Sequence, residues 1–396
     1  MLFADAAARI EASARELWPG RTVRLGARIP SVTCYVQNID VDGRGLVAKV
    51  SYLGVSIVSL LRGARGDWPA VRAAQADYVT APGALVGREA AQLRLMEKVP
   101  GLAVCPVAGA RNGVLFTGRV LGPTLTDLLI AAPEHSAELL GRVTRSLQPL
   151  RFPALPRGAA VPQTPERGIR AVFVRKMRGA AGQLYLRRLG EERIRDGQER
   201  EQVRLLLVAS VERLMRHRAL SQPRCPALIH GDLKPEHLLF PEGADGAPVF
   251  LDPGLQYGGE CADIAKLLSR TLLHLLATPY PPEAAERALA GIDVFVRAQA
   301  RTPARAAGAQ DLWLRRLVIM WLMDTVNITS SYLSAPAALP LPAPAPDLVG
   351  RALALAALVD RGSALLDADR TPMPRLWPRF LDAVRVLVRG ETGAAR

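Results

Sequence analysis

The first third of the chain shows short apolar patterns that alternate between strand and helix periods. Residues 23–60 alternate apolar and polar side chains and are rich in Val, Ile, Thr and Tyr, and the sequence DVDGRG at 40–45 is typical of a hairpin turn. From residue 87 the apolar positions follow a helical stripe that ends before a Pro-Gly pair. Strand-like runs follow at 102–109 and 113–121. We therefore expect a small antiparallel sheet with one principal helix.

The rest of the chain is dominated by helical patterns. Helical spacing is clearest at 134–148, 182–218, 283–300, 347–366 and 376–389. Short strands and turns return at 228–260, and the Pro-rich run at 335–346 predicts a stiff loop. The patterns thus predict an α+β chain with a small N-terminal lobe, residues 1–120, and a larger, mainly helical C-terminal lobe, residues 121–396.

Composition places the chain among globular proteins. Its 396 residues are 49% hydrophobic and 22% charged, which is enough apolar material for two substantial cores. The net charge of +14 comes almost entirely from arginine, since only five of the 51 basic residues are lysines. Abundant Arg, Ala, Gly and Pro are typical of GC-rich genomes, so this charge is weak support for nucleic-acid binding. A basic surface favours an anionic substrate over a polycationic one.

The cysteines and the apolar runs indicate where the protein resides. The cysteines are far apart and have neither a CxxC motif nor the spacing of a zinc site, so we expect free buried thiols in a reducing cytoplasm. They are Cys34, Cys105, Cys225 and Cys261. The N-terminal residues lack the apolar core of a signal peptide, and the apolar run at 317–323 is far too short to cross a bilayer. We therefore expect a cytoplasmic protein without a membrane partner.

A polar stretch between apolar ends stands out at residues 228–240, LIHGDLKPEHLLF. Polar loops held between short strands often carry catalytic groups. Asp232 in this stretch has a counterpart in Asp252, which ends an apolar strand twenty residues later in VFLDPG. Two acids at neighbouring strand ends can together hold a metal ion and a reacting hydroxyl group.

The sequences HGDLKPEHLLF and VFLDPG resemble the catalytic loop and the metal-binding loop of protein-kinase-like enzymes, most closely those of the aminoglycoside phosphotransferase and choline kinase branch. The resemblance implies a two-lobed protein-kinase-like fold that uses ATP or GTP with Mg²⁺ and transfers the γ-phosphoryl group to a hydroxyl group of a small molecule. It implies that Asp232 orients and deprotonates the substrate hydroxyl, that Lys234 reaches the transferring phosphoryl group, and that Asp252 binds magnesium.

Two positions in the catalytic loop depart from this pattern. His237 stands where the pattern has a metal-binding asparagine, and imidazole is a softer ligand than the amide oxygen that suits magnesium. Either His237 binds the metal ion in a less usual way, or Asp252 holds it alone, or catalysis is weak. Gly231 replaces an arginine that in many protein kinases binds a phosphorylated activation loop, which implies an enzyme without phosphorylation control.

The same pattern requires a lysine for the nucleotide phosphates and a helical glutamate that holds this lysine. Lys49 in GLVAKVS and Glu89 in GREAAQLRLM occupy these positions, and Glu97, later on the same helix, is the alternative partner. The roughly forty residues between Lys49 and Glu89 exceed what a small lobe needs. We therefore expect an insertion at about 52–86.

The turn that covers the phosphates should precede Lys49, where ARIPSVTCYV lacks a Gly-x-Gly sequence. Ser31 and Thr33 would instead offer hydroxyl groups and backbone amides to the phosphates. The stretch GVLFTGRVL resembles the hinge at which adenine bonds to the backbone. The expected hinge residues are Thr117, Gly118, Arg119 and Val120.

The remaining charged residues are assigned supporting roles. Asp263 in ADIAKL matches an acid that braces the catalytic loop by accepting backbone hydrogen bonds, and His230 is expected to pack beneath this loop. The stretch 174–204 mixes both charges at i, i+4 spacing, which is typical of a solvated helix face and would also suit the lining of an anionic substrate cleft. The other histidines are expected to be structural: His135, His217 and His274.

Two other functions remain open at this point. The first is a catalytically weak, nucleotide-binding pseudokinase that acts as a regulator or scaffold, which His237 and the glycine-free turn would explain. The second is an arginine-rich nucleic-acid binder, whose affinity would fall steeply with salt. The order of the candidate residues along the chain favours a kinase that acts on a metabolite or an antibiotic, and argues against nucleic acid as a partner. The sequence assigns no oligomeric state.

Overall fold

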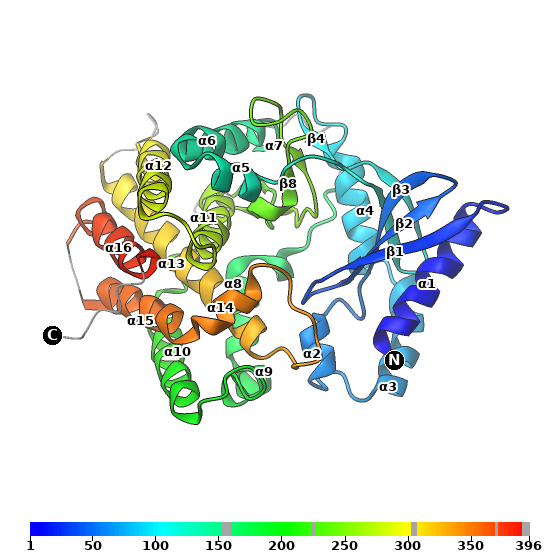
Figure 1. The fold of residues 1–396 in the computed structure, drawn as a ribbon, viewed down its shortest axis with the longest axis horizontal. Helices are drawn as coiled ribbons and strands as arrows, with labels where there is room; N and C mark the ends of the chain where they lie inside the picture. The colour runs from blue at the N-terminus through cyan, green and yellow to red at the C-terminus, as the bar shows by residue number, and fades with distance from the viewer. Residues whose placement is uncertain (152–159, 223–225, 302–306, 369–370, 390–396) are drawn as a thin grey trace.

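The chain folds into two lobes, which lie at opposite ends of the molecule in Figure 1. The structure is a computed structural model and describes residues 1–151, 160–222, 226–301, 307–368 and 371–389. A small lobe contains the antiparallel sheet and its helices, and a larger body consists mainly of helices. The two-lobed α+β architecture predicted from the sequence is confirmed.

The sheet of the small lobe has five antiparallel strands in the order β1-β2-β3-β6-β5. The strands are β1 (Val23–Ile29), β2 (Tyr35–Val41), β3 (Arg44–Val50), β5 (Val107–Arg111) and β6 (Val114–Gly118). The turn between β2 and β3 contains Asp42 and Gly43, both with positive φ, and Asp40 Oδ1 accepts a hydrogen bond from the Gly43 N–H. Positive φ at both central residues is what a two-residue hairpin with a type I′ turn requires, so the predicted hairpin forms.

Helices cover both faces of this sheet. Leu115 packs with Val86 and Ala90 of α4 (Leu85–Met96), whereas the neighbouring Phe116 contacts Trp18 beside α1 (Leu2–Leu17). Successive side chains of a strand point to opposite faces, so the sheet is sandwiched between α1 and α4. The pattern predicted one principal helix. The structure adds α1, and α2 (Ile57–Leu61) and α3 (Trp68–Thr80) lie within residues 52–86.

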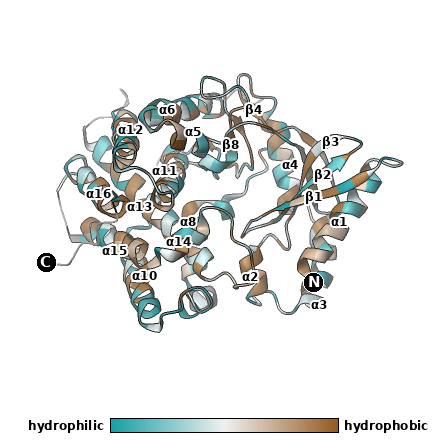
Figure 2. Cartoon of the chain, viewed as in Figure 1, coloured by the Kyte–Doolittle hydropathy of each residue, from teal (hydrophilic) through white to brown (hydrophobic). Residues whose placement is uncertain are grey.

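Twelve helices make up the described part of the larger lobe, together with short turns of other helix types. They are α5 (Leu125–Ala131), α6 (Ser136–Ser146), α7 (Gln148–Arg151), α8 (Ile169–Met177), α9 (Gly179–Gly182), α10 (Gly197–His217), α11 (Glu260–Ala277), α12 (Pro282–Ala300), α13 (Ala307–Leu333), α14 (Ala345–Gly350), α15 (Ala352–Ala368) and α16 (Met373–Val388). The apolar run at 317–323 lies in the buried middle of α13, where Trp321 packs edge-on against Trp377. Figure 2 shows the apolar residues along these helices. None of the helices in the described ranges is long and apolar enough to cross a membrane.

Two predicted elements are broken in the structure. The helix expected at 182–218 starts as a π-helical turn (Gln183–Arg187) and is interrupted at Gly190, which has φ +71°. A regular helix resumes only at α10, where the Asp196 side chain caps the helix by accepting a hydrogen bond from the Gln198 N–H. The strand expected at 102–109 splits at Pro106, which has no N–H to donate. Its first part, β4 (Ala103–Val104), pairs with β9 of the larger lobe rather than with the main sheet.

Short strands of the larger lobe hold the motif residues. They form the sheets β4-β9-β8 and β10-β7, with β7 (Ala227–Ile229), β8 (Leu238–Leu239), β9 (Val249–Phe250) and β10 (Gln256–Gly258). The Pro-rich stretch at 335–346 runs through turns and contacts the small lobe, because Leu339 and Pro340 line a small cavity with Ser31 and Cys34 of the β1–β2 turn.

Candidate active site

The loop at residues 230–237 and the loop that carries Asp252 lie side by side because their flanking strands pair. β7 pairs with β10, and β8 pairs with β9. Gly231 has φ +79°, and a Cβ at this position would lie 2.0 Å from the carbonyl oxygen of Gly254. Only glycine permits this approach. The arginine that the kinase pattern has here therefore finds no room in this chain.

Helix α11 holds the loop at 230–237 through the side chain of Asp263. The carboxylate of Asp263 accepts hydrogen bonds from the backbone N–H groups of His230 at 3.0 Å and Gly231 at 2.7 Å, which are the contacts expected of it. The His230 ring is buried against Phe250, with ring centroids 5.8 Å apart. Burial lowers the pKa of His230, so this ring is neutral and acts in packing.

Asp232 is surrounded by cations on both carboxylate oxygens. Lys266 Nζ lies 2.7 Å from Oδ1, while Lys234 Nζ and Arg167 Nη2 lie 3.0 and 2.9 Å from Oδ2. Burial alone would raise the pKa of this carboxyl group, but the neighbouring cations, Lys234 foremost, hold the pKa well below its ordinary value. Asp232 is therefore ionised at any physiological pH and can accept a proton or a hydrogen bond.

Strand register directs Lys49 toward helix α4. Lys49 is opposite Leu115 in the β3–β6 pair, and directly opposed side chains share a face of the sheet, here the face that α4 covers. Lys49 Nζ lies 2.7 Å from Glu89 Oε1 and 3.0 Å from Asp252 Oδ2. Glu89 is 1% exposed, whereas Glu97, the alternative partner, is exposed at the end of α4.

Neighbouring opposite charges keep Lys49 and Asp252 ionised. Burial favours neutral lysine, but Asp252 and Glu89 outweigh it and raise the pKa of Lys49. Burial likewise favours a neutral carboxyl group at Asp252, but Lys49 lowers its pKa. Asp252 also has φ +46°, a left-handed conformation that non-glycine residues seldom adopt.

His237 and Asp252 are brought together at the place where the pattern has two metal ligands. His237 Nε2 lies 3.8 Å from Asp252 Oδ2. Burial, together with the cation of Lys234, lowers the pKa of His237 to about 4, so its imidazole is neutral and has a lone pair to donate. His237 Nδ1 is buried and has no hydrogen-bond partner among the described residues. The pair fits a divalent cation that takes its other ligands from phosphates and water, since the described residues contain no cluster of three or more potential metal ligands.

The site follows the arrangement of the kinase pattern. It has a lysine on the third strand, a glutamate on the helix behind this strand, and an acid on each of two adjacent loops. The chain has a protein-kinase-like fold. No protein-family model and no curated protein matches its sequence.

Solved structures of small-molecule kinases are similar to the chain as a whole. A microcompartment-associated aminopropanol kinase is 16% identical, with 91% of this chain and 94% of that chain covered and a TM-score of 0.49. An amicoumacin kinase, solved with AMP-PNP, Ca²⁺ and its substrate, is 16% identical over 93% and 97% of the two chains, with a TM-score of 0.48. An aminoglycoside-3′-phosphotransferase of type VIII is 21% identical over 81% and 98%, with a TM-score of 0.45.

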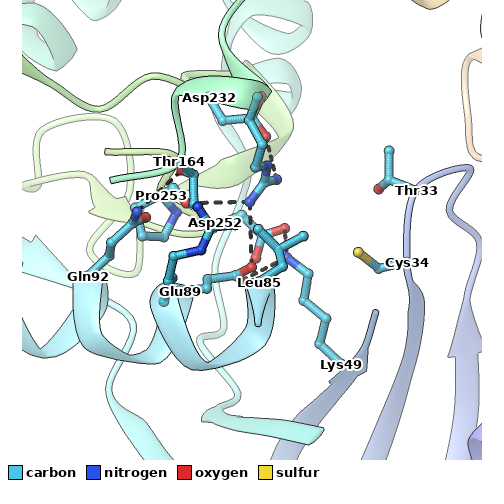
Figure 3. A network of polar contacts seen from close by, with 12 residues as sticks. Thr33, Cys34, Lys49, Leu85, Glu89, Gln92, Thr164, Asp232, Asp252 and Pro253 are labelled. Carbon is cyan, nitrogen blue, oxygen red and sulfur yellow. Dashed lines mark hydrogen bonds and ion pairs between the residues drawn. The ribbon is translucent and has the colours of Figure 1, made fainter. Parts of the chain in front are cut away.

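The expected phosphate turn connects β1 and β2. The Ser31 hydroxyl oxygen accepts hydrogen bonds from the backbone N–H groups of Thr33 and Cys34, at 3.2 and 3.4 Å, so it stabilises the turn itself. The Thr33 side chain is exposed. In Figure 3 Thr33 and Cys34 stand apart from the Lys49 network, on the ribbon that faces it. The Thr33 hydroxyl also lies 3.2 Å from the Ser31 hydroxyl, so both predicted hydroxyl groups take part in this turn, and Thr33 is the more exposed of the two residues.

Part of the expected hinge is already engaged. Gly118 N–H donates to Pro106 O at 2.9 Å, its carbonyl oxygen accepts from the Cys105 thiol at 3.1 Å, and Arg119 N–H donates to Gly45 O at 3.3 Å. Thr117 is paired within the sheet. A base bound here would have to use other backbone groups, between Arg119 and Val120.

Arg167 is a site residue that the sequence analysis missed. It lies on a short 3-10 helix (Pro165–Arg167) before α8, and its guanidinium reaches Asp232 and lies 3.5 Å from Glu89 Oε2. No motif marks PERGIR. The sequence before residue 169 has no helical pattern. Long irregular segments in compact domains are often functional, so this absence was the available signal for a site residue there.

Proposed function

We propose that this protein is a kinase that transfers the γ-phosphoryl group of ATP or GTP to a hydroxyl group of a small molecule. The observation that carries the proposal is the double contact of Lys49 with Glu89 and Asp252, formed beside an ionised Asp232. These residues come from four different segments and serve no evident packing purpose. Ionisable groups with strongly shifted pKa values cluster at functional sites, so their convergence supports a site for a charged ligand.

Each residue has a role in this reaction. Asp232 accepts the hydrogen bond of the substrate hydroxyl and then its proton, while Lys234 stabilises charge on the transferring group. Lys49 binds phosphate oxygens and is held in place by Glu89. Asp252, with His237, holds a divalent cation, which supplies positive charge at the phosphates when bound. Positioning and charge stabilisation account for catalysis, without a covalent intermediate.

The nucleotide would lie between the sheet and the larger lobe. Thr33 and the backbone of the β1–β2 turn would contact the phosphates. Ser31 would contact them through its backbone N–H group. The adenine or guanine base would bind at the expected hinge, residues 117–120, through the backbone groups between Arg119 and Val120. Either base has both donors and acceptors for backbone groups, and the proposal includes both nucleotides.

The charge around Asp232 favours a neutral or anionic acceptor over a polycationic one. Lys234, Lys266 and Arg167 contact the Asp232 carboxylate, and the chain as a whole carries a net charge of +14. A polycationic antibiotic would meet repulsion there, whereas a carboxylated or phosphorylated alcohol would not. We therefore place such alcohols first among the candidate acceptors.

A catalytically weak pseudokinase is the second candidate, motivated by His237. It is less well supported, because a protein that only binds nucleotide has no need of an ionised Asp232 with three cations around it.

The test is a screen for nucleotide consumption against pools of metabolites and antibiotics, run with ATP and with GTP. Asp232→Asn should reduce turnover by about three to four orders of magnitude and leave nucleotide affinity largely intact. Arg204→Gln, at an exposed ion pair with Glu201 on α10, is the control for loss of an arginine. Equal turnover by the wild type and Asp232→Asn would refute the assignment, and nucleotide binding without turnover in any pool would favour the pseudokinase.

A further inference from the structure

A segment between the two lobes links helix α4 to the loop that carries Asp252. We call this segment, residues 161–168, the strap. The Gln92 side chain on α4 joins all three parts: its Nε2 donates to Pro162 O and to Thr164 Oγ1, the latter at 3.2 Å, and its Oε1 accepts from Leu255 N–H at 3.1 Å. Figure 3 shows Gln92 and Thr164 next to Pro253.

Further bonds hold the strap on both sides. On the α4 side, Arg88 donates to Gln163 O at 2.7 Å and pairs with Glu166. On the loop side, Thr164 N–H donates to Leu255 O at 2.8 Å. Thr164 is fully buried. The strap is therefore bonded through side-chain and backbone groups to helix α4 and to the loop that carries Asp252. Both elements must be correctly placed for Lys49 to contact Glu89 and Asp252 together.

Arg167, the second-last residue of the strap, spans the two lobes. Its Nη2 donates to Asp232 Oδ2 at 2.9 Å, and its Nη1 lies 3.5 Å both from Glu89 Oε2 and from Pro253 O. Glu89 keeps its other oxygen, Oε1, for Lys49. Arg167 thus adds to the Lys49–Glu89 pair and does not compete with it. An inhibitory plug, a residue that blocks the site, would instead displace Lys49 from Glu89.

We propose that the strap assembles the active site and that Arg167 is the positioning residue through which it couples helix α4 to Asp232. The proposal rests on the kinase function proposed above. Residues 253–259, which join Asp252 to α11, contact α4 through the bond from the Leu255 N–H to Gln92. The strap, which comes from an earlier part of the sequence, bonds to both partners of this contact and so reinforces it.

Arg167→Gln tests the proposal by removing the charge while keeping a polar side chain. Turnover should fall by about a hundredfold, because Asp232 and α4 lose their common anchor and small displacements in a site cost rate steeply. Nucleotide affinity should change much less than turnover, since Lys49 retains Glu89. Arg167→Lys should recover part of the turnover, as it restores charge without the two-pronged geometry. Arg204→Gln is the matched control and should behave as the wild type.

Hydrogen exchange gives a readout that does not need an acceptor. Backbone amides of α4 and of residues 252–258 should exchange faster in Arg167→Gln and in Gln92→Ala, and at the wild-type rate in Arg204→Gln. Because both substitutions act through the strap, the double variant should lose little more than the worse single variant. Gln92→Ala also covers the case in which Arg167→Gln does not fold.

The outcomes separate this proposal from the kinase assignment. Unchanged exchange in α4 together with unchanged turnover in Arg167→Gln would overturn the strap, and so would an increase in turnover, which would make Arg167 an inhibitory plug. Absence of turnover in the wild type with every acceptor would overturn the kinase assignment. In that case, faster exchange in α4 in both strap variants would still support the strap, and unchanged exchange would reject it.

Discussion

His237 Nε2 lies 3.8 Å from Asp252 Oδ2, too far for a hydrogen bond and close enough for both atoms to bind one cation. The imidazole is neutral, since burial lowers its pKa to about 4. Neutral imidazole is a good ligand for Mn²⁺, Co²⁺ or Zn²⁺ and a poor one for Mg²⁺. The substitution of His for Asn in this loop therefore bears on which metal ion the protein uses.

His237→Asn should change the metal preference of the reaction. With histidine, Mn²⁺ or Co²⁺ should support faster nucleotide turnover than Mg²⁺ at equal concentration. With asparagine, Mg²⁺ should gain relative to both, because an amide oxygen is a hard ligand. The measurement is turnover in each metal after removal of bound ions with a chelator. An identical order of metals in both proteins would mean that His237 is not a ligand.

Lys49→Met should weaken both the fold and nucleotide binding. The substitution leaves Glu89, which is 1% exposed, without its contact at Oε1, and breaking a buried ion pair costs about 3 kcal/mol of unfolding free energy. Denaturant unfolding and nucleotide titration measure the two effects. Lys98→Met, at an exposed lysine just after the same helix, is the control and should alter neither.

The sequence predicted those parts of the site that come from local motifs. Lys49, Asp232 and Asp252 each lie in a short stretch whose neighbours determine a strand end or a tight loop, so the pattern of nearby residues was enough to place them. The same holds for Asp263, whose helix follows directly after the second loop. The pairing of Lys49 with Glu89 followed from their order along the chain.

The parts that could not be predicted depend on packing between distant segments. Arg167 is 65 residues from Asp232 and 78 residues from Glu89, and nothing in its own neighbours indicates that a strap brings it to both. The break in the helix expected at 182–218 was hidden for a related reason. Charged residues at helical spacing continue through the break, whereas the turn depends on Gly190 and on capping by Asp196.

Lys266→Met should shift the pH dependence of turnover. In the wild type the pKa of Asp232 lies well below its ordinary value, so this carboxylate stays ionised and turnover should not decline on its account between pH 8 and pH 5. Removal of the Lys266 cation, 2.7 Å from Oδ1, raises the pKa of Asp232. The acid limb of kcat/KM should then appear at a higher pH than in the wild type. A profile that is identical in the two proteins would contradict the assignment of Asp232 as the proton acceptor.

Arg62→Ala should release helix α2 from the larger lobe. Arg62 Nε donates to Ser334 O at 2.7 Å and Nη1 lies 2.8 Å from Glu192 Oε1, while the neighbouring Ser59 hydroxyl lies 2.6 Å from the hydroxyl of Tyr185. Through these bonds the α2 segment joins the lobes at a second place, away from the hinge (Figure 1).

Loss of the arginine leaves the Ser334 carbonyl without its donor, which costs about 1–3 kcal/mol of unfolding free energy. Backbone amides of α2 should also exchange faster, because the remaining bonds to Tyr185 join only its hydroxyl to those of Ser59 and Ser56, at 2.6 and 3.5 Å. The control is Arg65→Ala, an exposed arginine in the turn after α2, which should leave stability and exchange unchanged. If both variants match the wild type in unfolding and in exchange, the contacts of α2 do not hold the lobes together.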